Sequence, residues 1–205
     1  MAGFAMNETR VFAPILAGLL ALLLAACSPA GGGAGEPPLE GASIGGPFTL
    51  TDQNGRRVSD TDFKGKYRLI YFGYTFCPDI CPVDLQLIGR GLSAFEKSDP
   101  ARAAKVQPIF ITTDPERDTP QVMKDYVSNF HSRLIGLTGK PDEIAAVAKR
   151  YGVYYSKRES EGSSDYLVDH VRVALLFDPQ GKPIVIVPHD QGVEGVVSEL
   201  ERWVN

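Results

Sequence analysis

Two cysteines, Cys77 and Cys81, lie four residues apart within the stretch YTFCPDICP at 74–82. Pro82 has no backbone N–H and disfavours α geometry at the residue before it, so a regular helix can begin only around this point. Free N–H groups at a helix start stabilise negative charge and therefore favour a thiolate over a thiol. The stretch predicts a dithiol that is redox-active or binds a metal ion.

The spacing of the cysteines narrows the chemistry. Thioredoxin-type enzymes use Cys-x-x-Cys, whereas three residues intervene here, which disfavours a simple thioredoxin. A peroxiredoxin-type peroxidase needs Thr three residues before its attacking cysteine, but Tyr74 and Pro78 occupy that offset from Cys77 and Cys81. A permanent disulfide between the two cysteines is a further alternative, although so short a loop gains little from chain entropy.

The chain contains three histidines, His131, His170 and His189. His131 follows a predicted helix and His189 lies in a predicted turn, so a structural role is expected for both. His170 precedes a predicted buried strand, on the side of the sheet that would face the dithiol; the alternative is a solvent-facing loop histidine. Two thiolates and an imidazole suit Cu(I) or Cu(II), while zinc is chemically possible. The predicted metal ligands are Cys77, Cys81 and His170.

Strand and helix patterns alternate around these residues. The turn dipeptide Asn54-Gly55 between short extended pieces predicts an N-terminal β-hairpin. Apolar runs at 67–72 and 106–112 predict buried strands, each followed by a helical pattern. Further elements are predicted at 83–97, 118–130, 134–137, 141–151, 171–177, 183–187 and 193–204.

This order of elements predicts a thioredoxin-like α/β fold, with a mixed central sheet flanked by helices. The functional crevice of such a sheet lies beyond the carboxyl ends of its strands, so the loops at 73–81 and 113–119 are expected to meet there. The polar segment Tyr155–Asp169 is expected to be a mobile excursion that lets the following His170 swing.

Three acidic residues are expected near the dithiol: Asp79, Asp114 and Asp118. They can act as hydrogen-bond acceptors around a metal site or as part of a docking surface. The structural alternatives are that Asp118 caps the following helix and that Asp79 begins the cysteine-bearing one.

The N-terminus has the pattern of an export signal. The apolar run Val11–Ala26 is shorter than the ~20 residues that comfortably span a membrane. It leads into Leu24-Ala25-Ala26-Cys27, which resembles the bacterial lipobox, whose cysteine takes a diacylglycerol; a plain anchor helix is the alternative. The expected division of the chain is a lipoprotein signal peptide at 1–26, a flexible tether at 27–43 and the thioredoxin-like domain at 44–205. The domain is therefore expected on the periplasmic or extracytoplasmic face of the membrane.

Four motifs together resemble the Sco/SenC family: YTFCPDICP at 74–82, DPERDTP at 114–120, GLTG at 136–139 and VDH at 168–170. The resemblance runs from about Ile44 to the C-terminus. It implies a membrane-tethered metallochaperone that carries copper to the dinuclear copper centre of cytochrome c oxidase during assembly. It also implies Cys77, Cys81 and His170 as ligands of one copper ion.

The expected partners are the copper-bearing subunit of cytochrome c oxidase, a second periplasmic copper carrier or a thiol reductant, and the membrane through the lipid anchor. Lys and Arg are scattered among Asp and Glu at a net charge of -4, so no nucleic-acid partner is expected. The alternative function is enzymatic, a thiol-disulfide reductase that keeps the oxidase cysteines reduced. Only the copper site requires His170, and the proline that a reductase would typically carry opposite its dithiol is missing between Tyr151 and Phe177.

Overall fold

The computed structural model describes residues 3, 35–159 and 166–205. Apart from Gly3, the predicted signal peptide lies outside these residues, as do Cys27 and much of the predicted tether. Residues Glu36–Asn205 form one compact unit, in which the backbone N–H of Leu39 donates to the carbonyl of Ile184 at 2.9 Å. Within the described ranges, no helix combines the length and the apolar character needed to cross a membrane.

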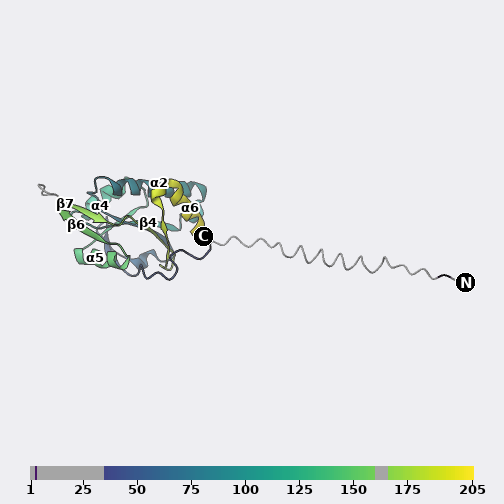
Figure 1. Ribbon diagram of the computed structural model, residues 1–205. Helices are drawn as coiled ribbons and strands as arrows, with labels where there is room; N and C mark the ends of the chain where they lie inside the picture. Colours follow the sequence, from purple (N-terminus) through teal and green to yellow (C-terminus); the bar gives the residue numbers. More distant parts are fainter. Residues whose placement is uncertain (1–2, 4–34, 160–165) are drawn as a thin grey trace. The chain divides into compact units, whose positions relative to one another are not determined.

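The centre of this unit is a mixed sheet of seven strands in the order β2-β1-β5-β4-β3-β8-β9 (Figure 1). The three central strands β3 (Tyr67–Gly73), β4 (Val106–Thr112) and β5 (Ile135–Thr138) run parallel, and the outer pairings are antiparallel. The outer strands are β1 (Thr49–Asp52), β2 (Arg57–Ser59), β8 (Ala174–Phe177) and β9 (Pro183–Val187). All seven residues of β3 are buried, as a strand covered on both faces requires.

Helices cover both faces of the sheet, and the side chains of β3 alternate between two apolar cores. Leu69 and Tyr71 pack with residues of α2, α4 and α6, whereas Ile70 and Phe72 pack with residues of α5. Figure 1 shows α2 and α6 together on one side and α5 on the other. The bounds are α2 (Ile80–Ser98), α3 (Pro100–Ala103), α4 (Pro120–Val127), α5 (Pro141–Arg150) and α6 (Val193–Trp203), with short 3-10 turns η2 (Asp60–Phe63) and η3 (His189–Gln191).

This architecture confirms the predicted thioredoxin-like class, with its mixed sheet, flanking helices and N-terminal β-hairpin of β1 and β2. One local prediction was wrong. The residue that caps α4 is Thr119, whose hydroxyl accepts from the N–H of Val122 at 3.4 Å, while Asp118 points elsewhere. Pro120 in the first turn, by contrast, lies where it was expected.

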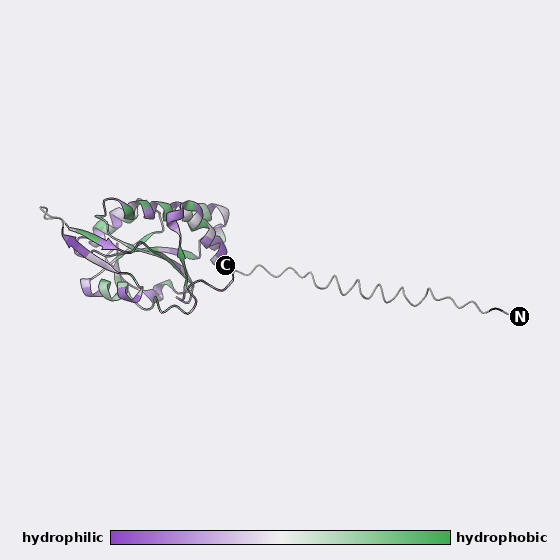
Figure 2. Ribbon diagram, viewed as in Figure 1, coloured by the Kyte–Doolittle hydropathy of each residue, from purple (hydrophilic) through white to green (hydrophobic). Residues whose placement is uncertain are grey.

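The polar segment before His170 is a second correction. Its described residues form the antiparallel strands β6 (Tyr155–Glu159) and β7 (Tyr166–His170) rather than an irregular loop, and residues 160–165, the middle of the predicted excursion, lie outside the described residues. These two strands pair only with each other and make a separate two-stranded sheet. Most of β6 is exposed and coloured as hydrophilic in Figure 2. This hairpin, called the β6–β7 hairpin below, ends on His170.

Candidate metal centre

The cysteines lie where β3 gives way to α2. Cys77 is half-buried in the connecting loop, and Cys81 is the fully buried second residue of α2, as the sequence predicted. The N–H of Cys81 donates to Cys77 Sγ at 3.4 Å, which uses one of the free donors of the helix start. Gly73, the last residue of β3, leaves room for this arrangement because a β-carbon there would lie 2.9 Å from Cys81 Sγ.

The imidazole of His170 reaches the dithiol from the β6–β7 hairpin. Its Nε2 lies 3.1 Å from Cys81 Sγ, and its Nδ1 lies 3.1 Å from the carbonyl oxygen of Val171. A carbonyl can only accept, so Nδ1 carries a proton, and Nε2 is the ring nitrogen that faces the sulfurs. The nitrogen that faces the cysteines is therefore the one able to bind a metal ion.

The two thiols have opposite electrostatic character. Hydrogen bonds from the Cys81 side chain, from His170 and from the backbone N–H groups of Cys81 and Asp79 hold the pKa of Cys77 well below its usual range. The neighbouring Cys77 sulfur and burial raise the pKa of Cys81. The expected thiolate at the helix start is thus Cys77 alone, with Cys81 as a protonated partner.

The loops at 73–81 and 113–119 meet, as predicted, through Asp118. This buried carboxylate accepts from the N–H of Thr75 at 3.1 Å and from its hydroxyl at 2.6 Å. It also accepts from the hydroxyl of Thr112 at the end of β4. Burial raises the pKa of Asp118 even though these hydrogen bonds favour its charged form. Asp118 therefore holds the cysteine loop against the sheet.

The loop at 113–119 also contacts the β6–β7 hairpin. Tyr166 donates its hydroxyl proton to Asp114 Oδ1 at 2.7 Å, and the guanidinium of Arg117 lies 3.8 Å from the centre of the Tyr166 ring. Arg117 also lies 4.8 Å from the centre of the Phe76 ring in the cysteine loop. Arg117 thus stands between the segment that carries the cysteines and the segment that carries His170.

Beside the three candidate ligands lies a polar cluster that the sequence pattern did not predict. Asp84, fully buried one turn after Cys81, accepts from the Tyr71 hydroxyl at 2.8 Å and from Arg172 Nε at 3.0 Å. His189, expected in a plain turn, is buried in η3 with Nε2 3.2 Å from Asp84 Oδ2. A signal was present, because Asp84 interrupts the apolar face of α2 at a spacing where a buried residue is required.

The remaining histidine, His131, takes no part in this region. It is buried beyond the end of α4, with Nε2 3.3 Å from Glu96 Oε2 and Nδ1 accepting from the N–H of Arg133. Its structural role was expected, although its partner is a carboxylate rather than a helix end.

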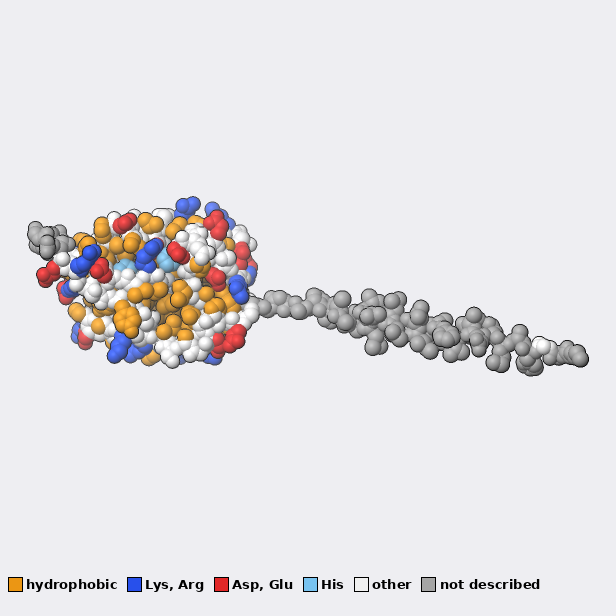
Figure 3. Space-filling view, viewed as in Figure 1, with side chains coloured by type: hydrophobic (Ala, Val, Ile, Leu, Met, Phe, Trp, Pro, Cys, Tyr) orange, Lys and Arg blue, Asp and Glu red, His pale blue; other side chains and the backbone are white. Residues whose placement is uncertain are grey.

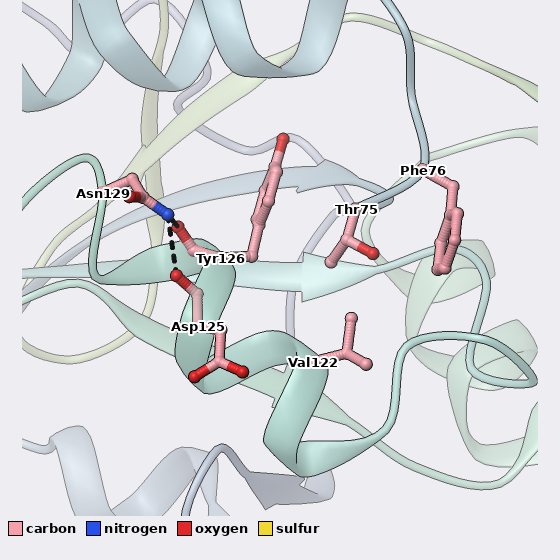
Figure 4. Close-up of a pocket in the computed structure, with 6 residues that line it drawn as sticks. All are labelled: Thr75, Phe76, Val122, Asp125, Tyr126 and Asn129. Carbon is pink, nitrogen blue, oxygen red and sulfur yellow. Dashed lines mark hydrogen bonds between the residues drawn. The ribbon is translucent and has the colours of Figure 1, made fainter.

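A cavity of about 230 Å³ opens beside the dithiol, and Cys77, Asp79, Arg158 and His170 are among the residues that line it. A larger cavity of about 370 Å³ lies on the α4 side of the same loop (Figure 4). The second cavity is lined by Thr75, Phe76, Val122, Asp125, Tyr126 and Asn129. Because no thiol or imidazole lines it, the chemistry of the loop belongs to the first cavity.

The described residues contain no three His, Cys, Asp or Glu side chains already arranged around a common point that could hold a metal ion. Cys77, Cys81 and His170 still lie within reach of one another, because Cys81 contacts each of the other two and His170 hydrogen-bonds to Cys77. Two sulfurs and one imidazole are nevertheless a donor set that fits copper. On the face shown in Figure 3, Lys and Arg side chains are mixed with Asp and Glu.

Comparison with known proteins gives clear relatives. The family profile described as SCO1/SenC matches residues 36–205. The mitochondrial protein SCO2 of Saccharomyces cerevisiae is 41% identical over 167 residues, which cover 79% of this chain and 54% of that protein. The chain thus spans about half the length of these curated relatives.

Solved structures agree. ScoI of Bradyrhizobium japonicum, solved with copper bound, is 46% identical with a TM-score of 0.70, over 78% of this chain and 99% of that one. The thioredoxin domain of a thiol-disulfide oxidoreductase from Bacteroides vulgatus is 19% identical with a TM-score of 0.54, over 80% of this chain and 96% of that one. The second likeness shows the fold alone. Because the family profile spans the whole folded unit, the chain belongs to the SCO1/SenC family.

Proposed function

We propose that this chain is a membrane-tethered copper chaperone on the extracytoplasmic side of its membrane. Cys77, Cys81 and His170 hold the ion, and its destination is the dinuclear copper centre of cytochrome c oxidase. The observation that carries the proposal is the 3.1 Å contact between Cys81 Sγ and His170 Nε2, which brings an imidazole to the dithiol. Copper in ScoI of Bradyrhizobium japonicum, a protein 46% identical to this chain, supports it.

Each of the three residues has its own part in such a transfer. Cys77 is the more exposed sulfur and is favoured as a thiolate, so it is the donor that a partner reaches first. Cys81 is buried and gives up its proton when it becomes a ligand. His170, on the β6–β7 hairpin, supplies a neutral donor that can leave without breaking the dithiol.

A second candidate function is thiol-disulfide reduction, which the unequal thiols favour. The Cys77 thiolate would attack a disulfide of the partner and form a mixed disulfide, with the partner's other sulfur leaving as a thiolate. Cys81, once deprotonated, would then attack Cys77 Sγ and release the partner's second thiol. The products are a reduced partner and a Cys77–Cys81 disulfide, which an external dithiol must reduce again.

The substitution His170→Ala separates the two functions. In the full chain, reduced and handled without oxygen, we expect Cu(I) affinity to fall by at least about tenfold to a hundredfold, or about 1.4 to 2.7 kcal/mol. The rate of disulfide exchange is expected to change far less, because it depends on the thiolate at Cys77 and on access to it. A competing Cu(I) chelator and a model disulfide measure the two quantities on the same samples.

His131→Gln is the matched control, since it removes an imidazole that lies against Glu96 and away from the dithiol. It should change neither quantity. In cells, His170→Ala is expected to lower oxidase activity when copper is scarce, and added copper should restore part of it. Full oxidase activity in His170→Ala cells at scarce copper, together with failure in Cys77→Ser cells, would favour the reductase.

The proposed tether is tested separately through Cys27. Metabolic labelling with a fatty acid should mark the full chain and should fail to mark Cys27→Ser, because the lipobox cysteine is the predicted site of acylation. Cys77→Ser is the control and should keep the label. Labelling that persists in Cys27→Ser contradicts the lipid anchor and leaves the copper site untouched.

A further inference from the structure

His170 lies in a strand outside the main sheet, so side-chain contacts have to hold it against the dithiol. Strands β6 and β7 hydrogen-bond to each other in a sheet of their own, and β8 joins the main sheet only from Ala174 onward. His170 is the last residue of β7, and residues 171–173 connect it to β8. Its backbone therefore lies outside the main-chain ladder that fixes the central strands.

One side-chain contact joins this connection to the helix that carries the cysteines. Arg172 donates from Nε to Asp84 Oδ2 at 3.0 Å and from Nη2 to Asp84 Oδ1 at 2.5 Å, so the guanidinium and the carboxylate meet in a bidentate pair. Residues three apart on a helix share a face, which places Cys81 and Asp84 on one side of α2. That side meets the other segment twice, at His170 and, two residues later, at Arg172.

Burial and contacts other than the one with Arg172 also hold Asp84 in place. Its side chain is fully buried, whereas 43% of the Arg172 side chain is exposed. The Tyr71 hydroxyl donates to Asp84 Oδ2, and His189 Nε2 lies 3.2 Å from the same oxygen without hydrogen-bond geometry. The Tyr71 ring also lies edge-on to His170 and to His189, with centroids 6.3 and 5.7 Å apart. The carboxylate is thus a fixed point to which the connection is tied.

We propose that Asp84 and Arg172 are positioning residues for the third copper ligand. Their bidentate pair holds the segment that carries His170 against the helix start that carries Cys81, so the imidazole faces the sulfurs before copper arrives. A donor that is already in place loses less conformational freedom on binding, which raises affinity without a new contact to the ion. The inference rests on the proposed ligand set.

A second bidentate ion pair, away from the dithiol, provides a control. Arg57 donates from Nη2 to Glu143 Oε1 at 2.7 Å and from Nη1 to Glu143 Oε2 at 3.2 Å, and half of the Arg57 side chain is exposed. Exposed pairs of this kind contribute little to structure because water screens them. The Arg57–Glu143 pair joins the edge strand β2 to α5, which packs on the opposite face of the sheet from α2.

The test is a comparison of Cu(I) affinities of the full, reduced chain by chelator competition. Arg172→Gln should weaken binding about tenfold, the lower range for partners that orient a metal ligand. Arg172→Lys keeps the positive charge but cannot form the bidentate pair, so its Cu(I) affinity should lie between those of Arg172→Gln and the unchanged chain. Arg57→Gln should leave the affinity unchanged. Asp84→Asn should act in the same direction as Arg172→Gln, with thermal unfolding of each copper-free variant recorded alongside.

The decisive measurement repeats Arg172→Gln in a His170→Ala background, where a residue that acts through His170 has nothing left to position. There it should weaken binding less than about twofold, as double-mutant cycles predict for coupled residues. An equal loss in both backgrounds shows a general structural role and overturns the inference, as does an unchanged affinity in Arg172→Gln. If His170→Ala alone has no effect, the proposed ligand set fails first, which is a separate outcome.

Discussion

The two segments that supply the candidate ligands are built in different ways. Cys77 and Cys81 follow a fully buried central strand and begin a helix of 19 residues that packs in the main core. His170 ends a two-stranded hairpin that lies outside the main sheet and touches the body mainly through side chains. The difference teaches that the dithiol is placed by the core of the fold, whereas the imidazole depends for its position on side-chain contacts between distant segments.

The largest effect is expected when a ligand is removed from the segment that begins α2. Cys81→Ser exchanges a soft sulfur for a hard hydroxyl of nearly the same shape, so Cu(I) affinity should fall by more than about a hundredfold, beyond the range for partners that only orient ligands. The fold should persist, which thermal unfolding of the copper-free chain would show. A loss smaller than that of His170→Ala would reverse the order of importance of the two segments.

The next effect compares the contacts that hold the two segments. Asp118→Ala leaves the donors of Thr75 and Thr112 unpaired in a buried place, so the free energy of unfolding should fall by about 2 to 4 kcal/mol. Tyr166→Phe removes one hydrogen bond between the hairpin and Asp114 and should cost about 1 kcal/mol or less. Urea unfolding measures both variants. Similar values for the two would contradict the contrast between a core segment and an attached one.

The smallest effect is a pH dependence at the joint between the segments. Burial acts to lower the pKa of His189, but Asp84 and the Val187 carbonyl outweigh it, and the net pKa is raised. A raised pKa in the folded state contributes stability that is fully present below the unfolded value of about 6.5 and is lost as pH rises through the folded value. The chain should therefore lose a little more stability between pH 6 and 9 than His189→Gln does in urea unfolding. If stability changes with pH by the same amount in both proteins, Asp84 does not stabilise a charged His189.

The sequence predicted the scaffold and the candidate ligands for local reasons. Strands β3 and β4 are unbroken apolar runs, which is what burial on both faces requires. The spacing of Cys77 and Cys81 is enough to identify them as a candidate pair. The β6–β7 hairpin was missed because its exposed Ser156, Lys157 and Arg158 have the composition of a loop, and a strand with a single partner and little burial carries no apolar alternation.

The contacts between distant parts of the chain were beyond local patterns. Asp84 and Arg172 are 88 residues apart, and each alone resembles an ordinary surface charge. Only the fold brings them together and buries the carboxylate. The role of Asp118 was hidden for a similar reason, because Asp118 and Thr119 are both good helix caps and the choice between them depends on Thr75 in another loop.

The self-contained pairing of β6 and β7 has a consequence for protein engineering. The hairpin lies in the sequence between α5 and β8, and its described strands form no backbone pairing with the seven-stranded sheet. It can therefore be lengthened, exchanged or transplanted without changing the register of any strand in that sheet. A designer who starts from a dithiol domain of this fold would graft one hairpin ending in an imidazole. An arginine two residues later, and a buried carboxylate one turn into the cysteine helix, would be the parts needed to seat it.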